Sequence, residues 1–285
     1  MEQNALMWVC YDSVETEIRS SLSKRLLWEK RKEQMRRSKI LNGKADNALR
    51  MMNNAGFRIK GPVRFVVDEK LPFMGYTMDQ EQEHSIVVAG KALSSGMIEG
   101  LLVHELSHIY RTETNHPSHN HTLLNGVAAQ IAAKSKIHAR YQVKILQEIV
   151  NHVQDLYADD ISFQVFAKNQ TRLGSLDQIG EFFLSWTRTE PAQSRNRKMK
   201  VWLDLSVMLN NAFVISNLER HQIRHFEQEA IRANQVFLSK IDSNLSESSA
   251  HFRTFMTNLK EEISEHEFKQ QLLKYMNSFI QLAVS

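Results

Sequence analysis

The sequence contains few of the residues that cross-link a chain through disulfides or interrupt its helices. Of its 285 residues, one is cysteine, four are proline and ten are glycine. Because Cys10 is the only cysteine, an intramolecular disulfide is excluded and a reducing compartment is favoured. No glycine follows Gly180 and no proline follows Pro191, while apolar residues keep recurring at helical intervals. We therefore expect the C-terminal third to be helical.

Long apolar runs are also missing. The best candidate, residues 201–215, is interrupted by Asp204, Asn210 and Asn211, and a membrane helix needs about 18 apolar residues in succession. Residues 1–6 show neither the basic nor the apolar region of a secretory signal. With 42% hydrophobic residues and a mean hydropathy of -0.40, the composition is that of a globular protein. We expect a cytoplasmic protein without a transmembrane segment.

The net charge of +4 is too small to require a polyanionic partner. Positive charge is concentrated between Ser13 and about Leu41, a stretch with a helical pattern. Its apolar side contains Leu26, Leu27, Trp28 and Met35. We favour a helix packed on the interior with a solvated basic face over one that binds nucleic acid or acidic lipid.

The strongest signal for chemistry is the motif H-E-x-x-H, formed by His104, Glu105 and His108. Two imidazoles four residues apart share one face of a helix, as two zinc ligands require. Glu105 is rotated by about 100° around the same helix and can reach a water on the metal without binding the metal. The motif therefore predicts a catalytic zinc site, one ion per chain.

The surroundings of the motif support this interpretation. Ser94-Ser95-Gly96 supplies a predicted N-cap, and the residues that follow have a helical apolar face. Just upstream, Ser85–Gly90 reads as a strand that leads into this helix, and we expect it to form the sheet edge on which an extended peptide could pair. Residues 57–60, 62–67 and, more weakly, 71–78 supply further strand material, so a small sheet should precede the motif helix.

A catalytic zinc needs a third protein ligand. The metzincin extension is excluded, because Arg111 and Thr114 occupy the positions of its glycine and histidine. The next long helical pattern contains Asp155 and Asp159, which are four residues apart and share a face. One of these carboxylates could bind the metal while the other accepts a hydrogen bond from a ligating imidazole.

With the H-E-x-x-H motif and the two aspartates taken together, residues 57–166 resemble the gluzincin zinc metallopeptidases. In that family H-E-x-x-H is followed on a later helix by a carboxylate ligand and a supporting Asp. D-x-x-A-D, at 155–159, is similar to E-x-x-A-D of the prenyl-protein and heat-shock gluzincin peptidases and of the small minigluzincins. The resemblance implies zinc binding by His104, His108 and Asp155, Glu105 as general base, and Asp159 as the residue that orients a histidine. The third ligand is Asp where the family has Glu, and the membrane spans of the nearest look-alikes are absent.

Other residues near the motif remain alternatives at this stage. His152, Asp159 and Asp160 compete with Asp155 for the third position. The segment Thr112–His121 reads as a polar loop, and we favour a hydrogen-bonded loop near the site over one whose histidines bind substrate or a second metal. Candidates for oxyanion or substrate contacts are Tyr157, His116 and His119. Tyr76, Met78 and His84 cannot be ranked as specificity residues.

The predicted fold class is α+β and zincin-like. We expect it to be mostly helical, with a small mixed sheet before the motif helix and an all-helical C-terminal bundle. We place a metallopeptidase domain with N-terminal helices at residues 1–186. A C-terminal helical region at 199–285 would pack on or cap the cleft, and its helices could mediate oligomerisation.

The favoured function is hydrolysis of peptide bonds by a metal-activated water in a soluble intracellular zinc metallopeptidase, with Glu105 passing the proton to the leaving amine. Two alternatives have the same motif: a regulatory protease that cleaves a single partner such as a repressor, and an inactive zincin-fold interaction protein. Substrate identity and oligomeric state lie beyond the sequence.

Overall fold

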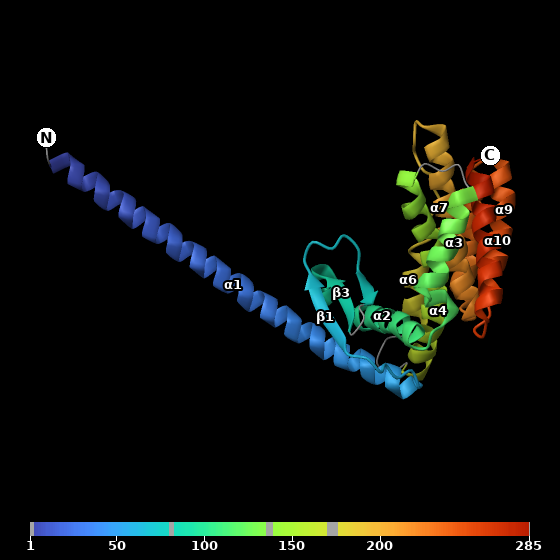
Figure 1. Cartoon of the computed structure of the whole chain (residues 1–285), viewed down its shortest axis with the longest axis horizontal. Coiled ribbons are helices and arrows are strands. Elements are labelled where there is room, and N and C mark those ends of the chain that lie inside the picture. Colours follow the sequence, from blue (N-terminus) through green and yellow to red (C-terminus); the bar gives the residue numbers. More distant parts are fainter. Residues whose placement is uncertain (1–2, 80–82, 135–138, 170–175, 285) are drawn as a thin grey trace.

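The computed structural model describes residues 3–79, 83–134, 139–169 and 176–284. Figure 1 shows a long N-terminal helix, a small sheet and a set of packed helices. The fold is therefore α+β and mostly helical, as predicted. The elements, in chain order, are α1 (Gln3–Ala55), β1 (Val63–Asp68), β2 (Gly75–Asp79), β3 (His84–Ala89), the 3-10 helix η1 (Gly90–Ser94), α2 (Ile98–Glu113), the 3-10 helix η2 (Pro117–His119), α3 (His121–Lys134), α4 (Ala139–Lys168), α6 (Leu176–Leu184), α7 (Arg197–Arg220), α8 (Arg224–Leu238), α9 (Ser243–Thr257) and α10 (Glu265–Val284).

The N-terminal helix α1 is one continuous element that extends past both ends of the helical stretch predicted between Ser13 and about Leu41, and it projects beyond the rest of the chain (Figure 1). Trp28 and Met35 are 57% and 67% exposed, so the prediction that this side packs on the interior is wrong for both. The side chains of Leu26 and Leu27 lie outside the described residues. The helix ends at Ala55 and is followed by Gly56, whose φ of +95° suits a residue without Cβ.

The sheet has the strand order β1-β3-β2, with β1 parallel and β2 antiparallel to β3. The strand predicted to form the edge, β3, is instead central, because it pairs with a neighbour on each side. Its residues Ser85–Ala89 are all buried, which accounts for the continuous apolar run that made it recognisable. The edge next to the motif helix is β2, a strand whose signal Gly75 and nearby Pro72 weaken.

The motif helix α2 packs against the sheet and α4, and its apolar face contributes Leu102, Leu106 and Ile109 to the core. Its N-terminus differs from the prediction. The N-cap residue is Met97, which makes no capping side-chain bond, while the Ser95 hydroxyl accepts a hydrogen bond from Met97 N at 3.1 Å. Residues 90–94 form the separate 3-10 turn η1.

The C-terminal third is helical, as the lack of glycine and proline predicted. By length and composition alone α7 could cross a membrane, but two thirds of its apolar window is buried inside the fold, as in the core helix of a globular protein. Its Asp204 and Asn211 are buried and bond the backbone of the segment before it, at Ala192 N and Arg188 N. The buried core runs from Leu41 to Ala283, across the predicted boundary at 187–198.

Candidate metal centre

Three predicted ligands converge where α2 crosses α4. The nitrogens or oxygens of His104, His108 and Asp155 lie within 4.8 Å of one another. The Nε2 atoms of the two histidines are 3.1 Å apart, and Asp155 Oδ1 is 3.4 Å from His108 Nε2 and 3.9 Å from His104 Nε2. A helical turn places the imidazoles side by side, and α4 brings in the carboxylate from a distant part of the sequence.

These separations fit a tetrahedral zinc ion. Zinc–ligand bonds of about 2.0–2.2 Å place neighbouring ligand atoms about 3.4 Å apart. The observed distances of 3.1, 3.4 and 3.9 Å lie on either side of that value. Two imidazoles and one carboxylate are also a donor set that zinc accepts in catalytic sites. The residues present therefore suit the metal.

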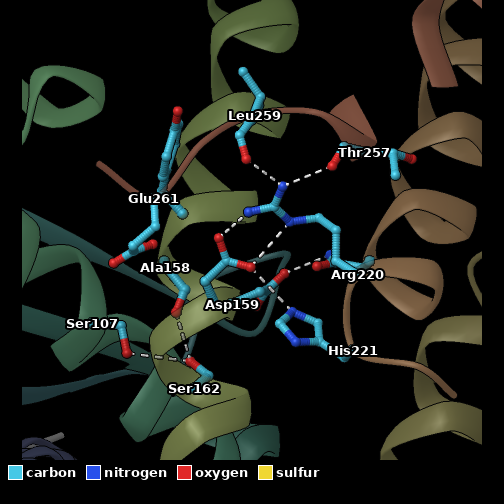
Figure 2. Close-up of polar contacts among 12 residues, drawn as sticks. Ser107, Ala158, Asp159, Ser162, Arg220, His221, Thr257, Leu259 and Glu261 are labelled. Atoms are coloured by element: carbon cyan, nitrogen blue, oxygen red, sulfur yellow. Dashed lines mark hydrogen bonds and ion pairs between the residues drawn. The ribbon is translucent and has the colours of Figure 1, made fainter. Parts of the chain in front are cut away.

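The helices approach closely enough for an aspartate to serve where the look-alike family has the longer glutamate. Ser107 of α2 and Ser162 of α4 meet with their hydroxyl oxygens 3.2 Å apart (Figure 2). Each hydroxyl also lies within hydrogen-bond distance of a carbonyl of its own helix. Both serines are buried. Two small side chains at the crossing shorten the distance that Asp155 has to span.

Behind His104 lies a second carboxylate. His104 Nδ1 is 2.8 Å from Asp159 Oδ1, and Asp159 Oδ2 accepts a hydrogen bond from Asn217 Nδ2 of α7 at 2.7 Å. Such a contact fixes the ring and leaves Nε2 free for a metal. The sequence predicted this pairing for Asp159. It gave no signal for Asn217, which lies 58 positions away.

Behind His108 lies a histidine from η2. His108 Nδ1 is 2.8 Å from His119 Nε2, and His119 is buried. Residues 117–119 are all buried, so the middle of the predicted polar loop is an interior turn. Each ligating imidazole thus has a supporting residue on its far nitrogen.

Glu105 faces the sheet edge. The Thr77 hydroxyl of β2 lies 2.8 Å from Glu105 Oε2 and 3.1 Å from the Glu105 carbonyl. This partner was not predicted, because Thr77 belongs to the weakest strand signal in the sequence.

The electrostatics of the centre favour a cation. Burial disfavours a charged imidazole, yet the carboxylates of Asp159, Asp155 and Glu105 outweigh it and raise the pKa of His104 to about 10. Burial likewise opposes ionisation of Asp155, but the neighbouring histidines hold its pKa below the ordinary value. Burial, His108 and Arg111 keep the pKa of His119 well below its usual range. Negative charge therefore gathers at the ligand cluster, with a neutral imidazole behind it.

A protein-family model for a family of unknown function (DUF5781) matches residues 45–281. The chain belongs to the DUF5781 family. Neither the curated proteins nor the solved structures give a match to it. The three ligands, Glu105 and the supporting residues all lie within the matched part of this DUF5781 chain.

The other candidates for the third ligand position contact other residues. Asp159 supports His104. Asp160 forms an ion pair with Arg220 of α7, and His221 lies 3.3 Å from it. His152 packs edge-on against Phe213. Among the described residues, the one ligand group of this kind contains Asp155.

The predicted oxyanion and substrate contacts are not supported. The Tyr157 hydroxyl is buried and donates to Lys260 O at 3.1 Å. His119 is occupied by His108 and Ser118, and His116 by Ser118 and Glu261 O. All three lie in the support behind the ligands.

Proposed function

We propose that this DUF5781 protein is a zinc-dependent peptidase with a zincin-like, gluzincin-type centre formed by His104, His108, Asp155 and Glu105. The observation that carries the proposal is the convergence of three ligand atoms within 4.8 Å, with a carboxylate behind the first histidine. This arrangement agrees with the resemblance to gluzincins. The single cysteine supports a cytoplasmic location.

The ligand count favours a catalytic zinc over a structural one. Structural sites are closed by four protein ligands, whereas catalytic sites use three and leave one position open. The described part of the chain offers three, and the side chain of Asp155 remains 34% exposed. Solvent therefore reaches the ligand cluster.

A zinc ion at this position would lower the pKa of a bound water towards about 7 and polarise a carbonyl. The residues supply the rest. Asp159 holds His104 in the tautomer that presents Nε2. Glu105 offers a carboxylate beside the ligands to accept a proton and return it to the leaving amine. Thr77 restricts that carboxylate to one orientation.

The edge strand β2 supports a peptide as the substrate class. Among the described residues its one strand neighbour is β3, so β2 is an edge strand with which an extended peptide could pair, and its Thr77 touches Glu105. An extended peptide paired there would run past the catalytic carboxylate. This role moves from β3, where the sequence placed it, to β2.

The test combines metal content and peptide cleavage. Purified protein should contain about one zinc per chain and cleave an unstructured protein such as casein or a peptide library. Glu105→Gln should keep the zinc and lose about 10²–10⁴-fold in kcat. His104→Ala should lose both the metal and the activity. Wild-type protein that binds no zinc, or full turnover by the Glu105 variant, would refute the proposal.

A further inference from the structure

A continuous line of hydrogen bonds runs from His108 into the C-terminal part of the fold. His108 Nδ1 lies 2.8 Å from His119 Nε2, and His119 Nδ1 lies 2.8 Å from Ser118 Oγ. The same hydroxyl lies 2.7 Å from His116 Nδ1, and His116 Nε2 lies 3.1 Å from the carbonyl of Glu261. We call His119, Ser118, His116 and Glu261 O the relay. Ser118 and His119 are buried.

The chemistry of the two ends fixes the direction of every bond in the relay. His108 Nε2 faces His104 and Asp155, so with a metal there its proton must sit on Nδ1 and be donated to His119. His119 then carries its own proton on Nδ1 and donates to Ser118. At the other end a carbonyl can only accept, so His116 donates from Nε2.

These two assignments meet at Ser118 without conflict. Its hydroxyl accepts from His119 and donates to His116 Nδ1, which has no proton in this tautomer. All rings of the relay are neutral, and both nitrogens of each supporting histidine are used. An alternating pattern of this kind allows one tautomer per ring.

The relay ends on a firmly held turn. Arg111 of α2 donates to both carboxylate oxygens of Glu261, at 2.7 and 2.8 Å, and to the Tyr157 carbonyl. The Tyr157 hydroxyl donates to Lys260 O. The turn between α9 and α10 is thus tied to α2 and α4, the two helices that carry the ligands.

We infer that His119 is a positioning residue of the metal centre: through Ser118 and His116 it is anchored to the α9–α10 turn and holds His108 with Nε2 toward the metal. The inference rests on the proposed zinc site and adds residues that H-E-x-x-H does not contain. It also gives α9 and α10 a part in the metal centre, through a backbone carbonyl between them.

The tautomers can be read directly. In zinc-loaded, full-length protein with ¹⁵N-labelled histidine, long-range ¹H–¹⁵N spectra should show His108 and His119 protonated on Nδ1 and His116 on Nε2. A His119 ring protonated on Nε2, or a charged one, overturns the inference.

Zinc affinity supplies the functional readout, measured by competition with a chelator. His119→Leu should weaken zinc binding about 10- to 100-fold, as the loss of such a support typically does. His119→Gln keeps an acceptor for His108 and should stay within a few-fold of wild type. Ser118→Ala, one bond further out, should fall between them and keeps the test available if His119→Leu does not fold.

Ser107→Ala is the matched control. Ser107 is a buried hydroxyl next to His108 on α2, and its hydrogen bonds go to Val103 O and Ser162. It should lower the melting temperature without changing zinc affinity. Equal affinities of wild type, His119→Leu and His119→Gln would overturn the inference while leaving the zinc site standing. Wild-type protein that binds no zinc would instead refute the proposed function.

Discussion

Thr77 contacts Glu105, the residue that we propose as the general base. Glu105 is buried, and the Thr77 hydroxyl is its partner at 2.8 Å. A hydrogen bond to a charged group contributes about 1.5–3 kcal/mol, and about 1.4 kcal/mol corresponds to a tenfold rate change. We therefore expect Thr77→Val to lower kcat on the order of tenfold.

Steady-state kinetics and zinc analysis check this prediction together. KM and zinc content should stay near wild type, because Thr77 contacts no ligand. Thr77→Ser keeps the hydroxyl and serves as the control, so it should retain most of the activity. A Thr77→Val protein with unchanged kcat would show that Glu105 needs no such restraint.

The charge on His104 makes the metal-free protein sensitive to alkali. Burial opposes protonation, but Asp159, Asp155 and Glu105 raise the pKa of His104 to about 10, whereas an unfolded histidine titrates near 6.5. The folded state holds the proton more tightly, so this contribution is complete below about pH 6.5 and is lost as the pH rises through about 10. Metal-free protein should lose stability across that range.

Urea unfolding in EDTA at several pH values measures this loss. His104→Gln removes the titrating group and should flatten the profile between pH 6.5 and 10. Zinc displaces the proton from the ring, so zinc affinity should rise over the same range. A wild-type profile as flat as that of the variant would contradict the prediction.

For single residues, the sequence was most informative where a function requires two side chains at a fixed spacing along one helix. His104 and His108 could be proposed as ligands because a helix places residues four apart on one face, and the choice of Asp155 over Asp159 came from the resemblance to gluzincins. Thr77, Asn217 and Ser118 could not, because they reach the site from other elements, and a threonine or an asparagine has many ordinary uses. The hydrogen-bonded loop favoured for Thr112–His121 agrees with the bonds of His116 and His119, but the sequence could not indicate which residue each of these histidines contacts.

A second arginine, Arg220, also connects elements around the site. Arg220, at the end of α7, lies in an ion pair with Asp160 of α4 and donates to the carbonyl of Met256. It also donates to the carbonyls of Thr257 and Leu259 (Figure 2). Both charged side chains are about one-tenth exposed, at 11% and 10%. Arg220 therefore joins the helix that carries Asp155 to the C-terminal helices.

We expect Arg220→Leu to destabilise the protein by about 3–5 kcal/mol, because it leaves the Asp160 charge buried without its main partner. Arg220→Lys should recover little of this lost stability, because one ammonium group cannot reach both the Asp160 carboxylate and the carbonyls. Urea unfolding gives the values. Arg253→Leu is the control: its side chain is 32% exposed, so its ion pairs should contribute about 1 kcal/mol or less.

The order of the strands in the sheet could not be predicted from the sequence, for a physical reason. A buried central strand is more apolar than an edge strand, so β3 gave the stronger signal although β2 lies beside Glu105. The pairing partners of a strand depend on contacts distant in sequence. The helical nature of the C-terminal third, by contrast, follows from local periodicity and the lack of glycine and proline.

For the whole molecule, the buried core and the family match begin at nearly the same place. The family model starts at residue 45, and Leu41 is the first fully buried side chain among those described. Described side chains before it, such as Trp28 and Met35, are largely exposed. The described side chains of α1 before Leu41 therefore contribute little to the buried core.

Deleting residues 1–32 should leave zinc content unchanged and shift the free energy of unfolding by less than about 1 kcal/mol, since the segment removes no described core side chain. Deleting residues 1–44 also removes Leu41 and should cost about 2–5 kcal/mol, as the loss of a buried leucine does. Urea unfolding of both truncations beside the full chain gives the comparison. A large loss on deleting residues 1–32 would mean that the projecting part of α1 stabilises the fold through contacts that its exposure does not reveal.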